Sequence, residues 1–201
     1  MPKTPSNTPV FQLTSQELLA DDWSTLTKYT FQFKRRDGTW QEQVRQAYDR
    51  GHGAACLLHN VADDTVLLTR QFRLPALIGD EARGHNGFLI EAPAGLLEGA
   101  DPAMRMKAEL EEETGYSVRD ITLVFDAFMS PGAVTERIAC FTGTYTANDK
   151  TGDGGGQEEE GEDIEVLHVR FDHAMEMISS GEIIDAKTIM LLQHLALQRA
   201  G

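Results

Sequence analysis

Cysteine, cationic residues and long apolar runs are all scarce in this chain. Its 201 residues include only two cysteines, Cys56 and Cys140, and both stand in apolar stretches that are typical of strands. This usage indicates two reduced core thiols rather than a disulfide framework. No run of about 18 apolar residues could cross a membrane, and the N-terminus carries no apolar signal core. We therefore expect a cytoplasmic protein without membrane association.

Positive charge is also in short supply. Lysine and arginine number 18 against 32 acidic residues, so the formal net charge is −14. A nucleic-acid backbone would be repelled, which argues against a nucleic-acid partner. A small anionic substrate meets the same repulsion, so it requires a bound cation or a local cluster of arginine and lysine. The length and the 41% hydrophobic share fit one domain with a small appendage at most.

Alternating apolar residues and turn signals predict more strands than helices. Residues 1–20 are polar with scattered prolines, and we expect them to be poorly ordered at the start. A hairpin over residues 25–46, turning at Asp37-Gly38, needs the main domain or another subunit to pack on. Further strands are predicted at 53–59, 65–72, 87–92, 121–129, 138–145 and 164–171, with helices at 102–114, 172–180 and 186–199. This order favours an α/β (α+β) sandwich with a mixed sheet, divided into an N-terminal hairpin segment, 1–47, and a main domain, 48–201.

A polar, glycine-rich segment separates Tyr145 from Ile164. It has too few apolar residues to bury itself, and a loop of this length is either disordered or functional. Its residues Asp149, Thr151, Asp153, Gly154 and Glu160 also fall at calcium-loop positions. A strand rather than a helix precedes them, so a calcium site is a minor alternative.

The helix predicted at 102–114 has both of its ends marked in the sequence. Asp101 is a good N-cap, Pro102 suits the first helical position, and Gly115 suits a left-handed residue that ends the helix. A strand with Pro93 at its end precedes the helix, and Gly95 permits close approach of the backbone to a ligand.

Glutamates gather on one face of that helix. Glu109 and Glu113 are four residues apart, and Glu112 lies at the edge of the same face. Like charges at this spacing repel, and a divalent cation would turn the repulsion into coordination by hard oxygen ligands. The alternative is a solvated acidic face.

The stretch from Gly95 to Tyr116 resembles the Nudix box, and Glu109 to Tyr116 match its second half completely. Ala108 stands where the family has an arginine that pairs with a box glutamate and orients it, and Lys107 is its neighbour. The box is one residue shorter than usual, as in the GDP-mannose pyrophosphatase branch of the family. Similarity to that branch covers most of residues 20–198, through the segments 21–23, 48–51, 70–73, 130–132, 162–166, 181–183 and 187–188.

The resemblance implies a Nudix-type α/β/α sandwich that uses Mg²⁺, with Mn²⁺ as a possible substitute. It assigns the metal to Glu109, Glu113, the carbonyl of Ala94 and Glu162, and it assigns catalysis to Glu112, Glu113 and Glu162. Glu112 would join a second ion or orient a water. Glu158, Glu159 and Glu160 compete with Glu162 for the loop position.

The implied reaction is hydrolysis of a nucleoside diphosphate sugar, GDP-mannose to GMP and mannose 1-phosphate. The alternatives are an ADP-ribose or ADP-sugar pyrophosphatase and a catalytically silent nucleotide-sugar sensor. Relatives are homodimers in which the N-terminal hairpin completes the partner's active site. Expected substrate contacts are Trp23, Arg45, Arg73, the backbone of Ala94, Gly95 and Leu96, Glu136 and Lys187. From the residues alone, a tryptophan such as Trp23 is more often a packing residue or an interface anchor. Arg73 is as readily a surface arginine, and the alternative for Glu136 is an ordinary turn acid.

Overall fold

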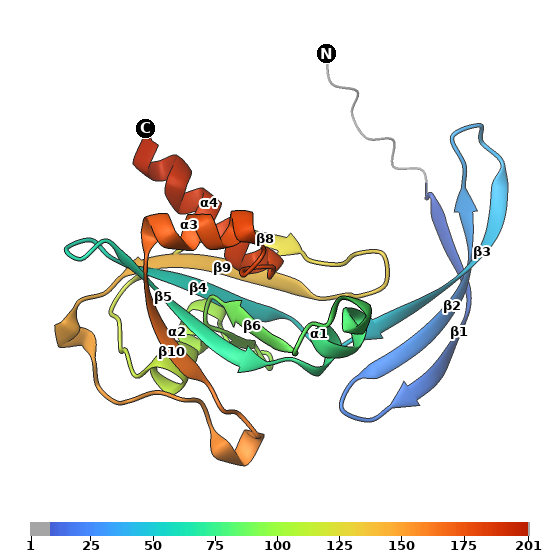
Figure 1. Ribbon diagram of the computed structural model, residues 1–201. Coiled ribbons are helices and arrows are strands. Elements are labelled where there is room, and N and C mark those ends of the chain that lie inside the picture. Colours follow the sequence, from blue (N-terminus) through green and yellow to red (C-terminus); the bar gives the residue numbers. More distant parts are fainter. Residues whose placement is uncertain (1–8, 201) are drawn as a thin grey trace. The chain divides into compact units, whose positions relative to one another are not determined.

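The computed structural model describes residues 9–200, apart from the side chains of Arg83 and Glu160. Contacts divide these residues into two compact units. One unit comprises residues 9–50 together with Ser130–Glu136, and the other comprises Gly51–Met129 and residues 137–200 (Figure 1).

The N-terminal unit is a three-stranded antiparallel sheet of β1 (Phe11–Asp21), β2 (Thr25–Lys34) and β3 (Trp40–Asp49), in that order. The predicted hairpin is present as β2 and β3. The expected two-stranded arrangement is wrong, because residues 11–20, expected to belong to a polar lead-in, form the third strand. Phe11 lies opposite Phe33 and Leu13 opposite Phe31, so apolar cross-strand pairs fix this strand on β2. Residues 1–8 lie outside the described chain.

The segment Ser130–Glu136 belongs to the same unit through backbone pairing with the end of β3. The Tyr48 N–H donates to the carbonyl of Ala133 (2.8 Å), and the Thr135 N–H donates to the carbonyl of Tyr48 (3.1 Å). A segment far along the chain is thereby fixed beside the last residues of the N-terminal sheet.

The larger unit is built on a seven-stranded mixed sheet. Its strand order is β10-β5-β4-β9-β8, with β6 on β5 and β7 on β4, and only β4 and β9 pair in parallel among the described pairs. The strands are β4 (Gly53–Asn60), β5 (Thr65–Phe72), β6 (Phe88–Glu91), β7 (Ala94–Leu96), β8 (Ile121–Phe128), β9 (Arg137–Thr144) and β10 (Glu165–Arg170).

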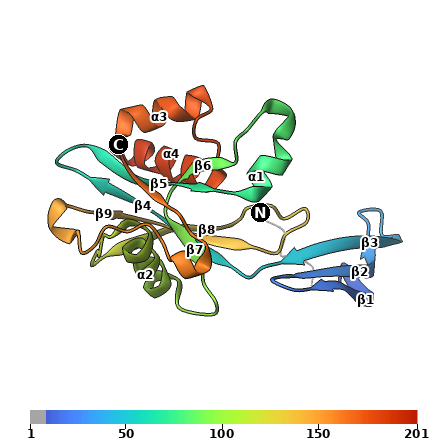
Figure 2. The ribbon, with the colours of Figure 1, turned by 60° about the horizontal axis from the view of Figure 1, so that its bottom comes forward.

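Helices cover both faces of this sheet (Figure 2). They are α1 (Leu74–Gly79), α2 (Pro102–Thr114), α3 (Phe171–Ser180) and α4 (Ala186–Ala200), with short 3-10 turns η1 (Glu81–Arg83), η2 (Ala147–Asp149) and η3 (Glu158–Glu160). α3 and α4 lie on one side and α2 lies on the other. The predicted α/β sandwich with a mixed sheet is confirmed, while α1 and β7 are elements that the sequence patterns did not predict.

Strand β4 supplies both faces of the core. Ala55 and Leu57 belong to the cluster under α3 and α4, and Cys56 and Leu58 belong to the cluster under α2. Because successive side chains of a strand point to opposite faces, a strand buried on both sides reads as a continuous apolar run. Cys56 and Cys140 are buried, free thiols, as predicted. None of the helices in residues 9–200 is long and apolar enough to cross a membrane.

Candidate active site

Helix α2 begins and ends where its sequence predicts. Oδ1 of Asp101 accepts hydrogen bonds from the N–H groups of Ala103 (3.1 Å) and Met104 (3.0 Å), and Pro102 occupies the first turn. Gly115 ends the helix at φ 74°, and its N–H donates to the carbonyl of Glu111. These two ends fix which residues of the helix face the sheet.

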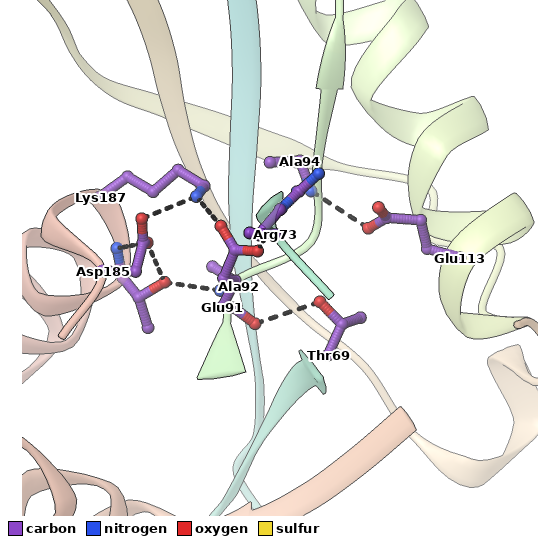
Figure 3. A network of polar contacts seen from close by, with 9 residues as sticks. Thr69, Arg73, Glu91, Ala92, Ala94, Glu113, Asp185 and Lys187 are labelled. Atoms are coloured by element: carbon purple, nitrogen blue, oxygen red, sulfur yellow. Dashed lines mark hydrogen bonds and ion pairs between the residues drawn. The ribbon is translucent and has the colours of Figure 1, made fainter. Parts of the chain in front are cut away.

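Two box glutamates lie on the inner face of α2, against the β7 strand. Glu109 is 7% exposed and Glu113 is 1% exposed. The N–H of Ala94 donates to Oε2 of Glu113 (3.1 Å; Figure 3). A Cβ on Gly95 would overlap the carboxylate of Glu109, so only glycine lets this carboxylate reach the β7 backbone. The sequence predicts that a ligand approaches the backbone closely at Gly95, and in the structure the side chain of Glu109 from α2 occupies this space.

The environment of Glu113 disfavours the charged form of its carboxyl group. Burial and the neighbouring carboxylates of Glu109 and Glu162 raise the pKa of Glu113 to about 8, against the lowering effect of the Ala94 N–H. A divalent cation would relieve this repulsion, and carboxylate and carbonyl oxygens are the ligands that Mg²⁺ prefers. Within residues 9–200 no three His, Cys, Asp or Glu side chains are gathered closely enough to form a metal cluster by themselves. The donor chemistry thus fits a cation held by side chains and backbone together.

Arg105 is a part of the site that sequence reasoning missed. Its Nη2 lies 2.7 Å from Oε1 of Glu109, and its Nη1 lies 3.3 Å from Oε2 of Glu112. Lys107, the neighbour of Ala108, instead donates to the carbonyl of Arg119 (3.0 Å). The guanidinium absent at position 108 is therefore supplied one turn earlier. The signal in the sequence was the four-residue spacing between Arg105 and Glu109.

A buried ionic network holds the strand that leads into β7 (Figure 3). Glu91 pairs with Lys187 and with Nε of Arg73 (2.7 Å), and Lys187 also pairs with Asp185 (2.8 Å). Burial by itself raises the pKa of Glu91, but Lys187 and Arg73 more than offset it, so the net pKa lies below its usual value. The hydroxyl of Thr188 accepts from the Ala92 N–H (2.7 Å), so the start of α4 holds the backbone beside Ala94.

The glycine-rich loop is packed against α2. The N–H of Gly155 donates to the carbonyl of Glu113 (2.9 Å), and Thr151 donates from Oγ1 to Glu111 (3.1 Å). Asp149 accepts from the Thr146 N–H (2.7 Å) as part of a local cap, so its carboxylate is engaged within its own turn. The calcium-loop alternative gains no support from these contacts. Glu160 is another residue at a calcium-loop position, and its side chain is not among those that the structure describes.

A family model and curated relatives that match this chain carry the same description. A family model described as the N-terminal domain of the GDP-mannose pyrophosphatase NudK matches residues 12–48. A GDP-mannose pyrophosphatase of Pectobacterium atrosepticum is 48% identical over 183 residues, covering 90% of this chain and 92% of the relative. One from Escherichia coli O9:H4 is 43% identical over 183 residues, covering 91% and 93%. The chain belongs to the GDP-mannose pyrophosphatase family of Nudix hydrolases. The prediction of a Nudix pyrophosphatase is thereby confirmed, and membership in a family of enzymes weighs against the silent-sensor alternative.

The fold agrees with this assignment to the Nudix hydrolases. A solved structure titled as an ADP compounds hydrolase superposes with a TM-score of 0.70 and covers 98% of both chains at 17% identity. Identity this low supports the fold alone. The Nudix-type sandwich expected from the sequence is confirmed by this likeness.

In this Nudix enzyme the predicted site residues fall into groups. The larger unit brings Glu109 and Glu113 together with Ala94 and Gly95. It also places Leu96 of β7 opposite Gly53 of β4, and it brings Arg73 and Lys187 to Glu91. Glu162 accepts from the Gln157 N–H (2.9 Å) and acts electrostatically on Glu113.

The N-terminal unit holds the remaining predicted residues. Trp23 is 71% exposed, and the guanidinium of Arg50 lies 5.6 Å from its ring centroid. Nε of Arg50 also lies 3.0 Å from Oε1 of Glu136, so one guanidinium joins Trp23 and Glu136. Arg45 donates from Nη1 to the carbonyl of Val44 (2.8 Å). Arg50 was not singled out as a site residue from the sequence.

Proposed function

We propose that this enzyme hydrolyses the pyrophosphate bond of GDP-mannose to give GMP and mannose 1-phosphate, with Mg²⁺ as its cofactor. The observation that carries the proposal is the buried pair Glu109 and Glu113 packed against the backbone of Ala94 and Gly95. The names of the relatives at 43% and 48% identity support the substrate.

The proposed roles are those that the family resemblance implies for these carboxylates. Glu109, Glu113, the carbonyl of Ala94 and Glu162 would hold Mg²⁺, or Mn²⁺ in its place. When bound, such an ion neutralises charge on phosphoryl oxygens and lowers the pKa of water. A water oxygen would bond to phosphorus while the bridging P–O bond breaks and its electron pair leaves with the released phosphate, and Glu162 would either help to bind the ion or accept the water proton. Glu112 orients this water or joins a second ion.

Arg73 and Lys187 are the proposed cations for the substrate phosphates. The side chain of Arg73 is 39% exposed, whereas that of Lys187 is 13% exposed and already pairs with two carboxylates. Arg73 is therefore the better placed of the two, because its guanidinium has donors to spare beyond the bond to Glu91. Lys187 would act chiefly by keeping Glu91 and Arg73 in position.

Residues of the N-terminal unit are proposed to recognise the rest of the substrate. The exposed indole of Trp23 offers a face for stacking on a base, and Glu136 offers a carboxylate to a sugar hydroxyl or a phosphate-bound water. Arg45 is proposed as an additional phosphate contact. The family resemblance implies a hairpin that acts across a dimer, and we propose that these three residues do so here.

A second copy of this chain is the proposed partner of the N-terminal sheet. No described residue of the N-terminal unit is fully buried, yet Phe11, Leu13, Leu18 and Val44 are all about half exposed. A small sheet without a core of its own needs an apolar partner to be stable. We propose a homodimer in the cytoplasm, a compartment in which the free thiols of Cys56 and Cys140 remain reduced.

The nearest rival is hydrolysis of ADP-ribose or another ADP-sugar, because base and sugar selectivity depend on a few hydrogen bonds. Side-by-side turnover of GDP-mannose, ADP-ribose and ADP-glucose at millimolar Mg²⁺ separates the two. We expect kcat/KM for GDP-mannose to be at least about tenfold higher than for either ADP compound, and we expect EDTA to abolish all turnover. A higher value for ADP-ribose would overturn the substrate assignment, and no product from any of the three would favour a sensor.

A further inference from the structure

The glycine-rich loop closes the C-terminal end of α2. Carbonyls in the last turn of a helix lack partners within the helix. Here the N–H groups of Gly155 and Gly156 donate to the carbonyls of Glu113 (2.9 Å) and Glu112 (3.1 Å), and the Thr151 N–H donates to the carbonyl of Gly115 (2.8 Å). The loop is thus bonded to the same turn of helix that carries the box glutamates.

Gly154 makes this close approach possible, and Gly156 leaves room for the side chain of Glu162. Gly154 has φ +71°, and a Cβ there would lie 2.6 Å from the carbonyl oxygen of Glu113. Gly156 has φ +80°, and a Cβ there would lie 2.5 Å from Oε2 of Glu162. By contrast, a Cβ on Gly152 would meet nothing within 4 Å, and its φ is not in the left-handed range. Any larger residue at 154 therefore lifts the loop from α2, and one at 156 displaces the side chain of Glu162, whereas one at 152 does neither.

Gln157 follows directly and bonds to two acidic residues at once. Its backbone N–H donates to Oε2 of Glu162 (2.9 Å), and its side-chain Nε2 donates to Oε2 of Glu112 (3.0 Å). Glu112 belongs to α2 and Glu162 to the loop, so Gln157 joins the two elements. Both carboxylates therefore accept a hydrogen bond from the same residue, and Glu112 also pairs with Arg105.

We propose that Gln157, carried by the docked loop of residues 151–157, is a positioning residue that sets Glu112 and Glu162 in place for the reaction. The inference rests on the proposed function, in which these two carboxylates act on the metal and the attacking water. Groups that orient metal-binding and water-orienting carboxylates change metal affinity or activity by about 10- to 100-fold when they are removed.

The first test replaces the amide without shortening the side chain. In Gln157→Met the amide donor to Glu112 is lost while Arg105 still pairs with this carboxylate. We expect kcat for GDP-mannose to fall about tenfold and the Kd for Mn²⁺ alone, measured by electron paramagnetic resonance, to rise about tenfold. KM and the Tm should be unchanged, because the substitution removes neither a substrate contact nor a core residue. Gln193→Met, at an exposed position of α4, is the matched control and should match the wild type.

The second test compares alanine substitutions at Gly154 and at Gly152. Gly154→Ala should raise the Kd for Mn²⁺ and expose residues 151–162 to limited proteolysis, while Gly152→Ala should behave as the wild type in both measurements. Far-ultraviolet circular dichroism checks that Gly154→Ala still folds.

The outcomes separate this inference from the proposed function. Wild-type kcat and Kd in Gln157→Met would overturn the assignment of Gln157, whatever Gly154→Ala does. Equal protease resistance of the two glycine variants would overturn the docked loop. Failure of the wild-type enzyme itself to bind Mn²⁺ at millimolar concentration would instead contradict the proposed metal site.

Discussion

Nη2 of Arg105 lies 2.7 Å from Oε1 of Glu109, one helical turn away. Both side chains are largely withdrawn from solvent, and Glu109 packs on Gly95 with the carboxylate of Glu113 nearby. The guanidinium is therefore the counter-charge of this acidic turn in the absence of a metal. A bound divalent cation would itself supply much of the positive charge that balances these glutamates.

Arg105→Ala is accordingly expected to destabilise the metal-free enzyme more than the metal-bound enzyme. Leaving Glu109 without its charged partner costs about 2 kcal/mol, which corresponds to a loss of about 4–8 °C in Tm for a domain of this size. In EDTA the full loss should appear, and in millimolar Mg²⁺ most of it should vanish. Differential scanning calorimetry under the two conditions measures both values.

Two further variants sharpen this test. Lys107→Ala removes a neighbouring cation that bonds elsewhere, and it should show no dependence on Mg²⁺. Adding Ala108→Arg to Arg105→Ala restores a guanidinium four residues before Glu112 and should recover part of the lost stability. A deficit of the same size with and without Mg²⁺ would contradict the link between Arg105 and the metal.

Glu113→Gln separates catalysis from folding. The loss of a carboxylate that is expected to hold the cation should lower turnover at saturating Mg²⁺ by at least about 100-fold. The metal-free Tm should stay the same or rise, because burial and its acidic neighbours raise the pKa of Glu113 to about 8 and a neutral amide avoids the cost of a buried charge. Near-normal turnover, or a Tm several degrees lower in EDTA, would count against this role.

Sequence patterns predicted most of the elements that position the site. The limits of α2 were correct because Asp101, Pro102 and Gly115 act locally, and local rules can be read from the chain. The limits of β5 were correct because turn signals flank an apolar run. Strand β1 does not follow from the sequence pattern because its apolar residues do not alternate regularly, and its pairing with β2 shifts register between Leu13 and Ser15 and between Leu18 and Ala20.

Long-range polar contacts were harder to predict. Glu91 and Lys187 are 96 residues apart in the chain, so no spacing rule joins them. Gln157 was passed over because its role depends on how the glycines bring the loop to α2. The sequence therefore shows which residue types are available for such contacts, but it does not show which residues lie next to one another in the fold.

Lys187→Met tests the buried network through pH. Glu91 would keep Arg73 but lose its other cation, and breaking a buried pair costs about 3–5 kcal/mol near neutral pH. In the wild type the lowered pKa of Glu91 contributes stability above pH about 4.5, and that contribution is lost as the pH falls below this value. In the variant the cation no longer offsets burial, so the Glu91 pKa rises and protonation relieves the buried charge.

The deficit of Lys187→Met should therefore be largest at pH 7–8 and shrink toward pH 5. Urea unfolding of both proteins at pH 5, 6, 7 and 8 gives the difference directly. The double variant Glu91→Gln/Lys187→Met should recover part of the stability at pH 7, since it leaves no buried unpaired carboxylate at position 91. A deficit independent of pH would show that the packing of Lys187, and not its charge, is what matters.

The N-terminal sheet provides the last prediction, because its apolar residues lie on both of its faces. Leu13 lies opposite Phe31 on one face, and Val44 lies opposite Thr30 on the other. If a second copy covers either face, a glutamate there would be desolvated without a counter-charge, at a cost of several kcal/mol. Each 1.4 kcal/mol weakens association tenfold, so one of the variants Leu13→Glu and Val44→Glu should dissociate the dimer.

Light scattering coupled to size exclusion measures the outcome, with wild type expected at twice the 22.2 kDa mass of the chain. Val61→Glu, in an exposed turn of the larger unit, is the matched control and should remain a dimer. The dissociated variant should also lose activity on GDP-mannose, because Trp23, Arg45 and Glu136 are proposed to act across the interface. A monomeric wild type, or two glutamate variants that both remain dimers, would rule out the sheet as the interface. A monomeric variant with full activity would still support the sheet as the interface. It would contradict the proposal that these three residues act from the second copy.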